Sequence, residues 1–139
     1  MTATVSSDLR VADLMTIDPI VVSIDASIED AEDLLRHNRI TGLPVVDLSG
    51  RLVGVISQTD LLYLEVPEVQ ALIRHRERGI RVGEVMSSPP VTITSSATTT
   101  EAARIMNRDH LHRLVAIDEH GWPVGVISAM DFVALAAEA

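Results

Sequence analysis

The chain has 139 residues; 47% are apolar but only three are aromatic, so its core must be built from aliphatic side chains. A formal charge of −9 argues against a nucleic-acid surface, which normally needs a basic face. Because cysteine is absent, the sequence offers no disulfide, no thiolate nucleophile and no Cys-ligated zinc. We find no signal-peptide pattern and no apolar run long enough to span a bilayer, and we therefore expect a cytoplasmic protein without a membrane partner.

The sequence patterns in the first half of the chain predict a unit that contains both helices and strands. After a flexible N-terminus at residues 1–8 come a short helical turn at 11–15 and a β-prone run at 20–24. A capping box at 27–30 then opens a helix with one apolar face. Strands at 43–47 and 52–57 form a hairpin, and a last helix begins near residue 59. A helical linker at 65–81 follows, opened by Pro67 and closed by Gly79.

The second half repeats the first at an offset of 71 residues. VGVISQTD at 53–60 returns as VGVISAMD at 124–131, and residues 11–64 match their counterparts without a gap. This match predicts a duplicated βαββα unit, with one copy at 9–64 and the other at 82–139. A three-stranded unit is too small to fold confidently alone. We therefore expect an α+β fold in which the two copies share a core about a pseudo-twofold axis.

Each copy keeps a serine and an aspartate three residues apart, at 57 and 60 and at 128 and 131. One interpretation is structural, because this spacing forms a capping box at a strand-to-helix turn. The other is functional, since a helix N-terminus favours an anion and a carboxylate there can accept hydrogen bonds from both ribose hydroxyls. The two roles are compatible.

Several motifs in order resemble the CBS domain, the module named after cystathionine β-synthase. They are Val-x-Asp/Glu-x-Met at 11–15 and 82–86, a proline before the first strand, Gly-Leu-Pro-Val-Val-Asp at 42–47, and Gly-Val-Ile-Ser-x-x-Asp at 54–60. The resemblance implies a tandem pair, or Bateman module, whose copies pack through their sheets. It also implies two clefts that bind adenosine-containing ligands such as AMP, ADP, ATP or S-adenosylmethionine. In the family, this binding regulates a partner protein. The resemblance therefore favours the ribose-binding interpretation of the two aspartates over the structural one.

The resemblance further implies that each cleft draws on both copies. Site one takes residues from the first copy and from the second. They are Ser57, Thr59 and Asp60 of the first copy, with Pro90, Leu111, His112 and Arg113 of the second. Site two is built likewise from Asp18, Pro19, Ile40, Thr41, Gly42, Pro44, Ser128 and Asp131. His112 and Arg113 can meet phosphates and suit site one to a phosphorylated nucleotide. Asp18 would repel phosphate, so we expect site two to be empty or to hold a less charged adenosyl group. Val115, where the first copy has Pro44, departs from the family pattern in the site-one wall.

The leading hypothesis is a non-enzymatic nucleotide sensor that forms a homodimer, an assembly the family often makes through its helices. The alternative is a structural dimerisation module that binds no ligand. A nucleotide hydrolase ranks last, because no catalytic constellation or phosphate-binding loop is evident. The pair His110 and His112 lacks a third ligand, so we expect no metal site.

Overall fold

The computed structural model describes residues 9–74, 76 and 79–138, and these form two compact units. Unit 1 combines the described residues up to Pro19 with those from Val91 onward, and unit 2 comprises Ile20–Pro90. The flexible N-terminus predicted for residues 1–8 lies outside the described residues, as do positions 75, 77 and 78 of the predicted linker.

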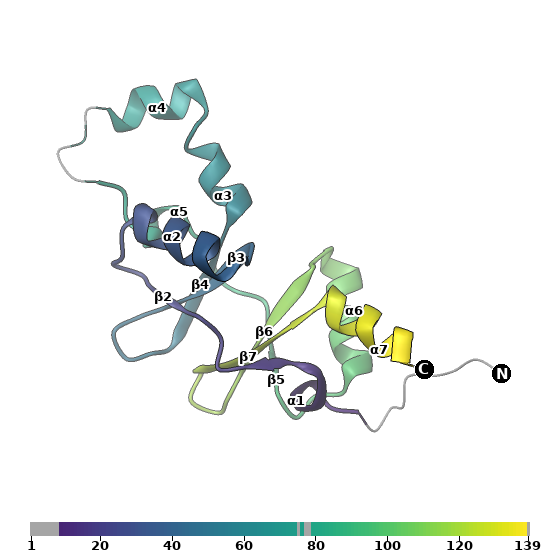
Figure 1. The fold of residues 1–139 in the computed structure, drawn as a ribbon. Helices are drawn as coiled ribbons and strands as arrows, with labels where there is room; N and C mark the ends of the chain where they lie inside the picture. The colour runs from purple at the N-terminus through teal and green to yellow at the C-terminus, as the bar shows by residue number, and fades with distance from the viewer. Residues whose placement is uncertain (1–8, 75, 77–78, 139) are drawn as a thin grey trace. The chain divides into compact units, whose positions relative to one another are not determined.

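Unit 2 is a three-stranded sheet with helices beside it (Figure 1). Its elements, in chain order, are β2 (Val22–Ser23), α2 (Ile28–Asn38), β3 (Gly42–Val46), β4 (Leu52–Ser57), α3 (Gln58–Tyr63), α4 (Pro67–Ile73) and α5 (Val82–Val85). The strand order is β2-β3-β4, with β2 parallel to β3 and β4 antiparallel to it. The core includes Leu35 of α2, Leu43 of β3, Ile56 of β4 and Val82 of α5.

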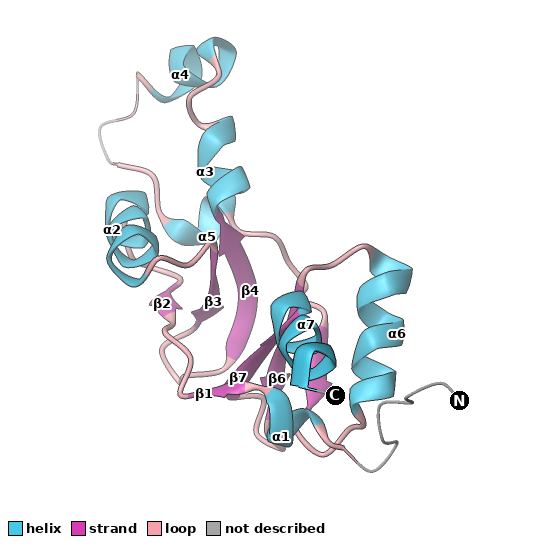
Figure 2. Cartoon of the chain, turned by 45° about the vertical axis from the view of Figure 1, so that its right-hand side comes forward, coloured by secondary structure: helices cyan, strands magenta, loops and turns pink. Residues whose placement is uncertain are grey.

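Unit 1 has the same plan with one more strand in its sheet (Figure 2). Its elements are α1 (Val11–Leu14), β1 (Thr16–Ile17), β5 (Thr92–Thr94), α6 (Thr99–Asp109), β6 (Arg113–Ile117), β7 (Pro123–Ser128) and α7 (Ala129–Glu138). The strand order is β1-β7-β6-β5. Val11 of α1, Met106 of α6, Leu114 of β6 and Ile127 of β7 meet in its core.

The duplication seen in the sequence is also present in the structure. Helices α2 and α6, strands β3 and β6, and strands β4 and β7 have bounds that differ by 71 residues at both ends. Both long helices end in a left-handed residue, Arg39 at φ 54° and His110 at φ 56°. The predicted α+β class and the predicted β-α-β-β-α order are therefore confirmed.

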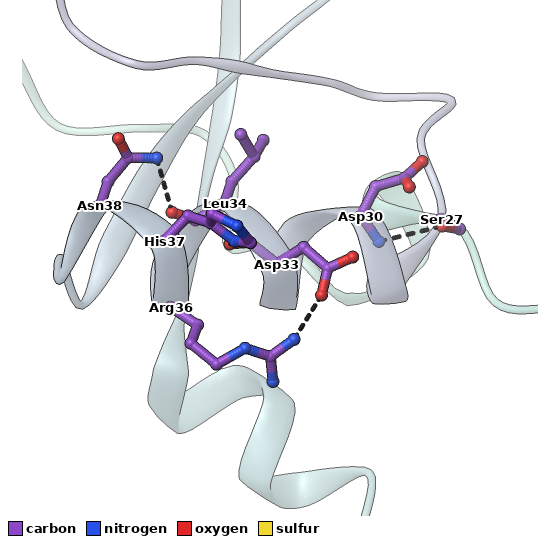
Figure 3. Close-up of polar contacts among 7 residues, drawn as sticks. All are labelled: Ser27, Asp30, Asp33, Leu34, Arg36, His37 and Asn38. Carbon is purple, nitrogen blue, oxygen red and sulfur yellow. Dashed lines mark hydrogen bonds and ion pairs between the residues drawn. The ribbon is translucent and has the colours of Figure 1, made fainter.

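Local hydrogen bonds explain where α2 begins and ends (Figure 3). The Ser27 hydroxyl accepts a hydrogen bond from the Asp30 amide at 3.1 Å, which satisfies one of the free N–H groups of the first turn. In the last turns the Asn38 side chain donates to the Leu34 carbonyl at 2.8 Å, and Arg36 forms an ion pair with Asp33. The Thr98 hydroxyl accepts from the Glu101 amide at 3.1 Å, so α6 begins in the same way.

Each compact unit contains the leading segment of the other copy, which the sequence did not reveal. We call residues 9–19 and 81–90 the leading segments of the first and second copies. The Val82 amide donates to the Ala26 carbonyl at 2.9 Å in unit 2, and the Val11 amide donates to the Ala97 carbonyl at 2.8 Å in unit 1. Val11 and Val82 are fully buried. The leading segment of one copy therefore completes the core beside the other copy's strands.

Glycines on β4 and β7 allow these leading segments to approach closely. A Cβ at Gly54 would lie 2.5 Å from Sδ of Met86 and 2.9 Å from the Ser87 carbonyl oxygen. A Cβ at Gly125 would lie 2.3 Å from Sδ of Met15. Glycine is needed at position 54 because the backbone of the leading segment lies against the strand there, whereas at Gly125 a larger residue would force the Met15 side chain to move.

Three local predictions differ from the structure. Strand β1 was not predicted, because two residues without alternation carry no strand signal; it exists through pairing with β7. The linker helix α4 ends at Ile73 rather than at Gly79. The last helix of the first copy begins at Gln58, one residue before the predicted start.

Replacing Thr99 by Val is expected to stabilise the protein. Thr99 is fully buried at the first position of α6, and among the described residues its hydroxyl is a buried side-chain group without a hydrogen-bond partner. An unsatisfied buried hydroxyl is costly, and valine has nearly the same shape. We expect the free energy of unfolding to rise by about 1 kcal/mol and the melting temperature by about 3 °C, measured by calorimetry. Thr100→Val, at the partly exposed neighbour, is the control; equal gains from both variants would contradict the explanation.

Candidate functional site

In unit 2 the Ser57–Asp60 motif forms a reciprocal capping box at the junction of β4 and α3. The Ser57 amide and hydroxyl donate to Oδ2 of Asp60 at 2.8 and 3.0 Å, and the Asp60 amide donates to the Ser57 hydroxyl at 3.2 Å. The structural interpretation of this motif is thus confirmed. The other carboxylate oxygen of Asp60, Oδ1, takes no part in the box, so the geometry leaves room for the second interpretation as well.

In unit 1 the Ser128–Asp131 motif has the corresponding arrangement between β7 and α7. The Ser128 amide and hydroxyl donate to Oδ2 of Asp131 at 2.7 and 3.1 Å. Both motifs are partly buried, where β4 and β7 end and the next helix begins. They differ at the residue before the aspartate, where Thr59 offers an exposed hydroxyl and Met130 an apolar side chain that is 69% exposed.

The hairpins bring a second pair of predicted site residues beside each motif. In unit 2 the Gln58 amide donates to the Thr41 carbonyl at 2.9 Å, and Gly42 lies directly opposite Ser57. Ile40 and Pro44 flank these positions. The sequence alone did not predict this adjacency, although the register of a two-strand hairpin carries it.

Unit 1 repeats this adjacency with basic residues. The Ala129 amide donates to the His112 carbonyl at 2.8 Å, and Arg113 is the cross-strand partner of Ser128. Directly opposed residues of an antiparallel pair project from the same face of the sheet. Arg113 is half-buried, and this burial lowers the pKa of its guanidinium, which still remains charged because arginine titrates far above neutral pH. Arg113, His112 and Leu111, which were predicted for site one, therefore lie in unit 1 near Ser128 and the start of α7.

The remaining predicted residues lie in the leading segments, which pair with β4 and β7. Ser87 forms a bridge with Val55 in unit 2, and Pro90 ends that segment. In unit 1, Thr16 pairs with Val126 and Ile17 with Gly125. The pairing of β1 with β7 ends at Ile17, and Asp18 and Pro19 follow it in the chain. Asp18 is exposed and has φ 51°, a left-handed conformation that aspartate tolerates.

Each unit also has a hollow between its two principal helices, which the sequence analysis missed. The unit 2 hollow has a volume of about 450 Å³ and is lined by Glu32, Leu35, Arg36, Arg39, Ile40, Gln58, Leu61, Leu62 and Glu65. The unit 1 hollow has a volume of about 400 Å³ and is lined by Ala103, Met106, Asn107, His110, Leu111, His112, Ala129 and Phe132. Most of these positions correspond at the 71-residue offset, but their charges do not.

The described residues contain no group of three or more histidines, cysteines or carboxylates arranged to hold a metal ion. His110 and His112 both line the unit 1 hollow. Over the same described part of the chain, no helix combines the length and the apolar composition that crossing a bilayer requires.

These observations define a class of protein built from a duplicated α+β module whose two strand-to-helix turns each hold a Ser-x-x-Asp motif. The CBS-domain family model matches residues 11–66 and 82–138. The chain belongs to the CBS-domain family, as a tandem pair.

Curated relatives share the pair within longer proteins. CBSX1 of Arabidopsis thaliana, named as chloroplastic, is 30% identical over 85% of this chain and 59% of its own length. Inosine-5′-monophosphate dehydrogenase of Korarchaeum cryptofilum is 31% identical over 82% of this chain but only 21% of its own length. The chain thus spans less than two thirds of these relatives, and its match to the dehydrogenase covers a minor part of that enzyme.

Solved structures of CBS pairs superpose well on the chain. CBSX2 of Arabidopsis thaliana, in a complex with AMP, has a TM-score of 0.82 and 35% identity, covering 94% of this chain and 97% of that one. The CBS domain pair of protein MJ0100, in a complex with 5′-methylthioadenosine and S-adenosyl-L-methionine, has a TM-score of 0.74 and 25% identity, covering 91% and 98%. Both are adenosyl-ligand complexes of tandem CBS pairs.

Proposed function

We propose that the chain is a non-enzymatic regulatory module, which binds an adenosine-containing ligand and signals its presence to a separate protein. The ligand is AMP, ADP, ATP or S-adenosylmethionine. The observation that carries this proposal is the Ser-x-x-Asp turn in both units, in a chain similar to CBSX2, whose structure contains AMP. A homodimer in the cytoplasm is the form in which we propose that it acts.

The two carboxylate oxygens of each aspartate have different roles, and this difference supports ribose binding. In both motifs the serine amide and hydroxyl donate to Oδ2 of the aspartate, so one carboxylate oxygen is enough to form the cap. The other oxygen is available to accept hydrogen bonds from ribose hydroxyls, which are donors that a carboxylate binds well. One residue can therefore shape the turn and hold the ligand.

We propose that the two sites prefer different ligands, and that the position of Arg113 determines which site takes the phosphorylated one. Arg113 lies opposite Ser128, so a phosphate held near the Ser128–Asp131 motif would meet both a guanidinium and a hydroxyl. The pairing that the family resemblance implies, in which Arg113 and His112 serve Asp60 across the two copies, is the alternative proposal. The Ser57–Asp60 motif is flanked by Thr41 and Gly42, which bring no cation, and suits a less charged adenosyl group.

Melting the protein with each of the named ligands tests the proposed function. A ligand at about one hundred times its dissociation constant stabilises the folded state by roughly 2.7 kcal/mol. For a chain of this size we expect the melting temperature to rise by roughly 5–10 °C. GMP at the same concentration controls for unspecific nucleotide effects. No shift with any adenosyl ligand would favour the alternative, a structural dimerisation module.

A further inference from the structure

The tip of the β6–β7 hairpin presents an aromatic side chain at the surface of unit 1. Trp122 is the only tryptophan in the sequence and is 49% exposed. Its ring lies beside that of His120, with the ring centroids 6.0 Å apart and the planes tilted by 51°. Nε2 of His120 lies 3.5 Å from a carboxylate oxygen of Glu119. The three side chains therefore form one continuous surface, in which an imidazole joins an indole to a carboxylate.

Hydrogen bonds hold this hairpin tip in one conformation. Oδ1 of Asp118 accepts from the amides of His120 and Trp122 at 2.9 and 3.0 Å, and the Gly121 amide donates to the Asp118 carbonyl at 3.1 Å. The bonds from the Trp122 and His120 amides hold the pKa of the Asp118 carboxyl below its usual range, so this group is charged at neutral pH. Because the backbone beside the indole is already fixed, binding a partner there orders little more of the chain.

The hairpin tip of unit 2 has the same turn with different side chains. Oδ1 of Asp47 accepts from the amides of Ser49 and Arg51 at 2.9 and 3.1 Å, which repeats the arrangement at Asp118. At the 71-residue offset the exchanged pairs are Leu48 with Glu119, Ser49 with His120 and Arg51 with Trp122. The duplicated turn thus carries an aromatic and anionic surface in unit 1 but an aliphatic and cationic one in unit 2.

The charges beside the indole indicate which partner this surface fits. A single exposed apolar side chain is ordinary on a protein surface and by itself calls for no partner. Here, however, Trp122 is flanked by the carboxylates of Asp118 and Glu119, and the Glu119 side chain is 86% exposed. An apolar or anionic partner would desolvate these carboxylates without giving them a counter-charge, which is unfavourable. A cation that can also lie on an aromatic face satisfies both parts of the surface.

We propose that the hairpin tip of unit 1, residues 118–122, is a docking site for an arginine side chain of the separate protein that the module regulates. A guanidinium is attracted to the face of an indole, and its planar shape and weak hydration suit it to stacking better than an ammonium. The Glu119 carboxylate is placed to pair with the same cation. The proposal rests on the proposed function only in assuming a protein partner, and it specifies the surface and the chemistry of that contact.

Peptide titration of the isotope-labelled full chain, followed by NMR, tests the proposal, because the one tryptophan gives one indole N–H signal. The probe is the blocked peptide Gly-Arg-Gly-Arg-Gly at physiological ionic strength, where distant charges are screened. We expect saturable shifts of the Trp122 indole and of the amides of residues 118–122. The lysine peptide of equal charge should bind about threefold more weakly, and the uncharged citrulline peptide about tenfold more weakly.

Exchanging the two hairpin tips provides matched variants, because both turns have the same aspartate-centred hydrogen bonds. The loss variant carries Glu119→Leu, His120→Ser and Trp122→Arg. It should lose the saturable shifts at residues 118–122. The gain variant carries Leu48→Glu, Ser49→His and Arg51→Trp. It should acquire saturable shifts at residues 47–51, with an affinity similar to that of the native tip. Unchanged signals elsewhere in the spectrum would show that each variant is folded.

Several results would overturn the proposal. Equal binding of the arginine and citrulline peptides would exclude a cation site, and tighter binding of Gly-Leu-Gly-Leu-Gly at the tip would indicate an apolar partner. Shifts spread over the acidic residues of α2, without saturation at the tip, would show attraction by net charge alone. The adenosyl-ligand melting shift of the loss variant is expected to equal that of the wild type. A normal melting shift without peptide binding would leave the sensing function standing, whereas peptide binding without any adenosyl-ligand shift would count against sensing alone.

Discussion

Residues 20–90 expressed alone are expected to fold and melt cooperatively, whereas residues 9–64 alone, a complete sequence repeat, are expected to remain largely unfolded. The first fragment is the compact unit 2 and the second is the first copy of the repeat. Circular dichroism melting and amide hydrogen exchange would distinguish them.

The physical reason is the exchange of leading segments. Val82 belongs to the second copy, is fully buried and packs in the core of unit 2, and Ile80, at the end of the linker, is only 7% exposed. Fragment 9–64 loses them, together with the bonds from Val82 to Ala26 and from Ser87 to Val55. Fully burying a valine or isoleucine contributes about 1.5–3 kcal/mol each, which is comparable to the whole stability of so small a domain.

Val82→Asp in fragment 20–90 is the control, since it should abolish the cooperative transition of that fragment. If fragment 9–64 melted as cooperatively as fragment 20–90, the leading segment would not be needed for the core. The folding unit would then coincide with the sequence repeat.

The loss of Asp131 or of the Arg113 charge is expected to remove most of the stabilisation by a phosphorylated adenine nucleotide, about 2.7 kcal/mol at one hundred times the dissociation constant. Asp131→Ala removes the proposed ribose acceptor. Arg113→Gln keeps much of the side-chain packing but removes the proposed phosphate partner. The measurement is the melting shift with and without ligand, because Asp131→Ala also costs about 1 kcal/mol by breaking the cap.

A double-mutant cycle decides which motif Arg113 serves. We expect Arg113→Gln and Asp131→Ala to be non-additive in the ligand shift, because they remove contacts to one ligand. Arg113→Gln and Asp60→Ala should add. The reverse pattern would place Arg113 with Asp60, as the family resemblance implied from the sequence. If an aspartate variant melts at a lower temperature yet keeps the full ligand-induced melting shift, that aspartate serves only as a helix cap.

The elements were largely predictable because the sequence contains each signal twice. The capping residues Ser27 and Thr98, and the hairpin strands around Gly50 and Gly121, are local features whose geometry depends on a few neighbouring residues. The Ser57–Asp60 and Ser128–Asp131 boxes formed as their spacing predicted. By contrast, β1 has only two residues, and its existence depends on a partner strand more than a hundred residues away.

By itself the sequence determined the duplication, the α+β elements and the two Ser-x-x-Asp turns. These follow from periodicity, capping and the 71-residue offset, which are all properties of short segments. Only the tertiary structure decided that each leading segment completes the other copy's unit and that Arg113 lies opposite Ser128. Each of these depends on strand register or burial, which arise from contacts between distant residues and leave no local signal in the chain.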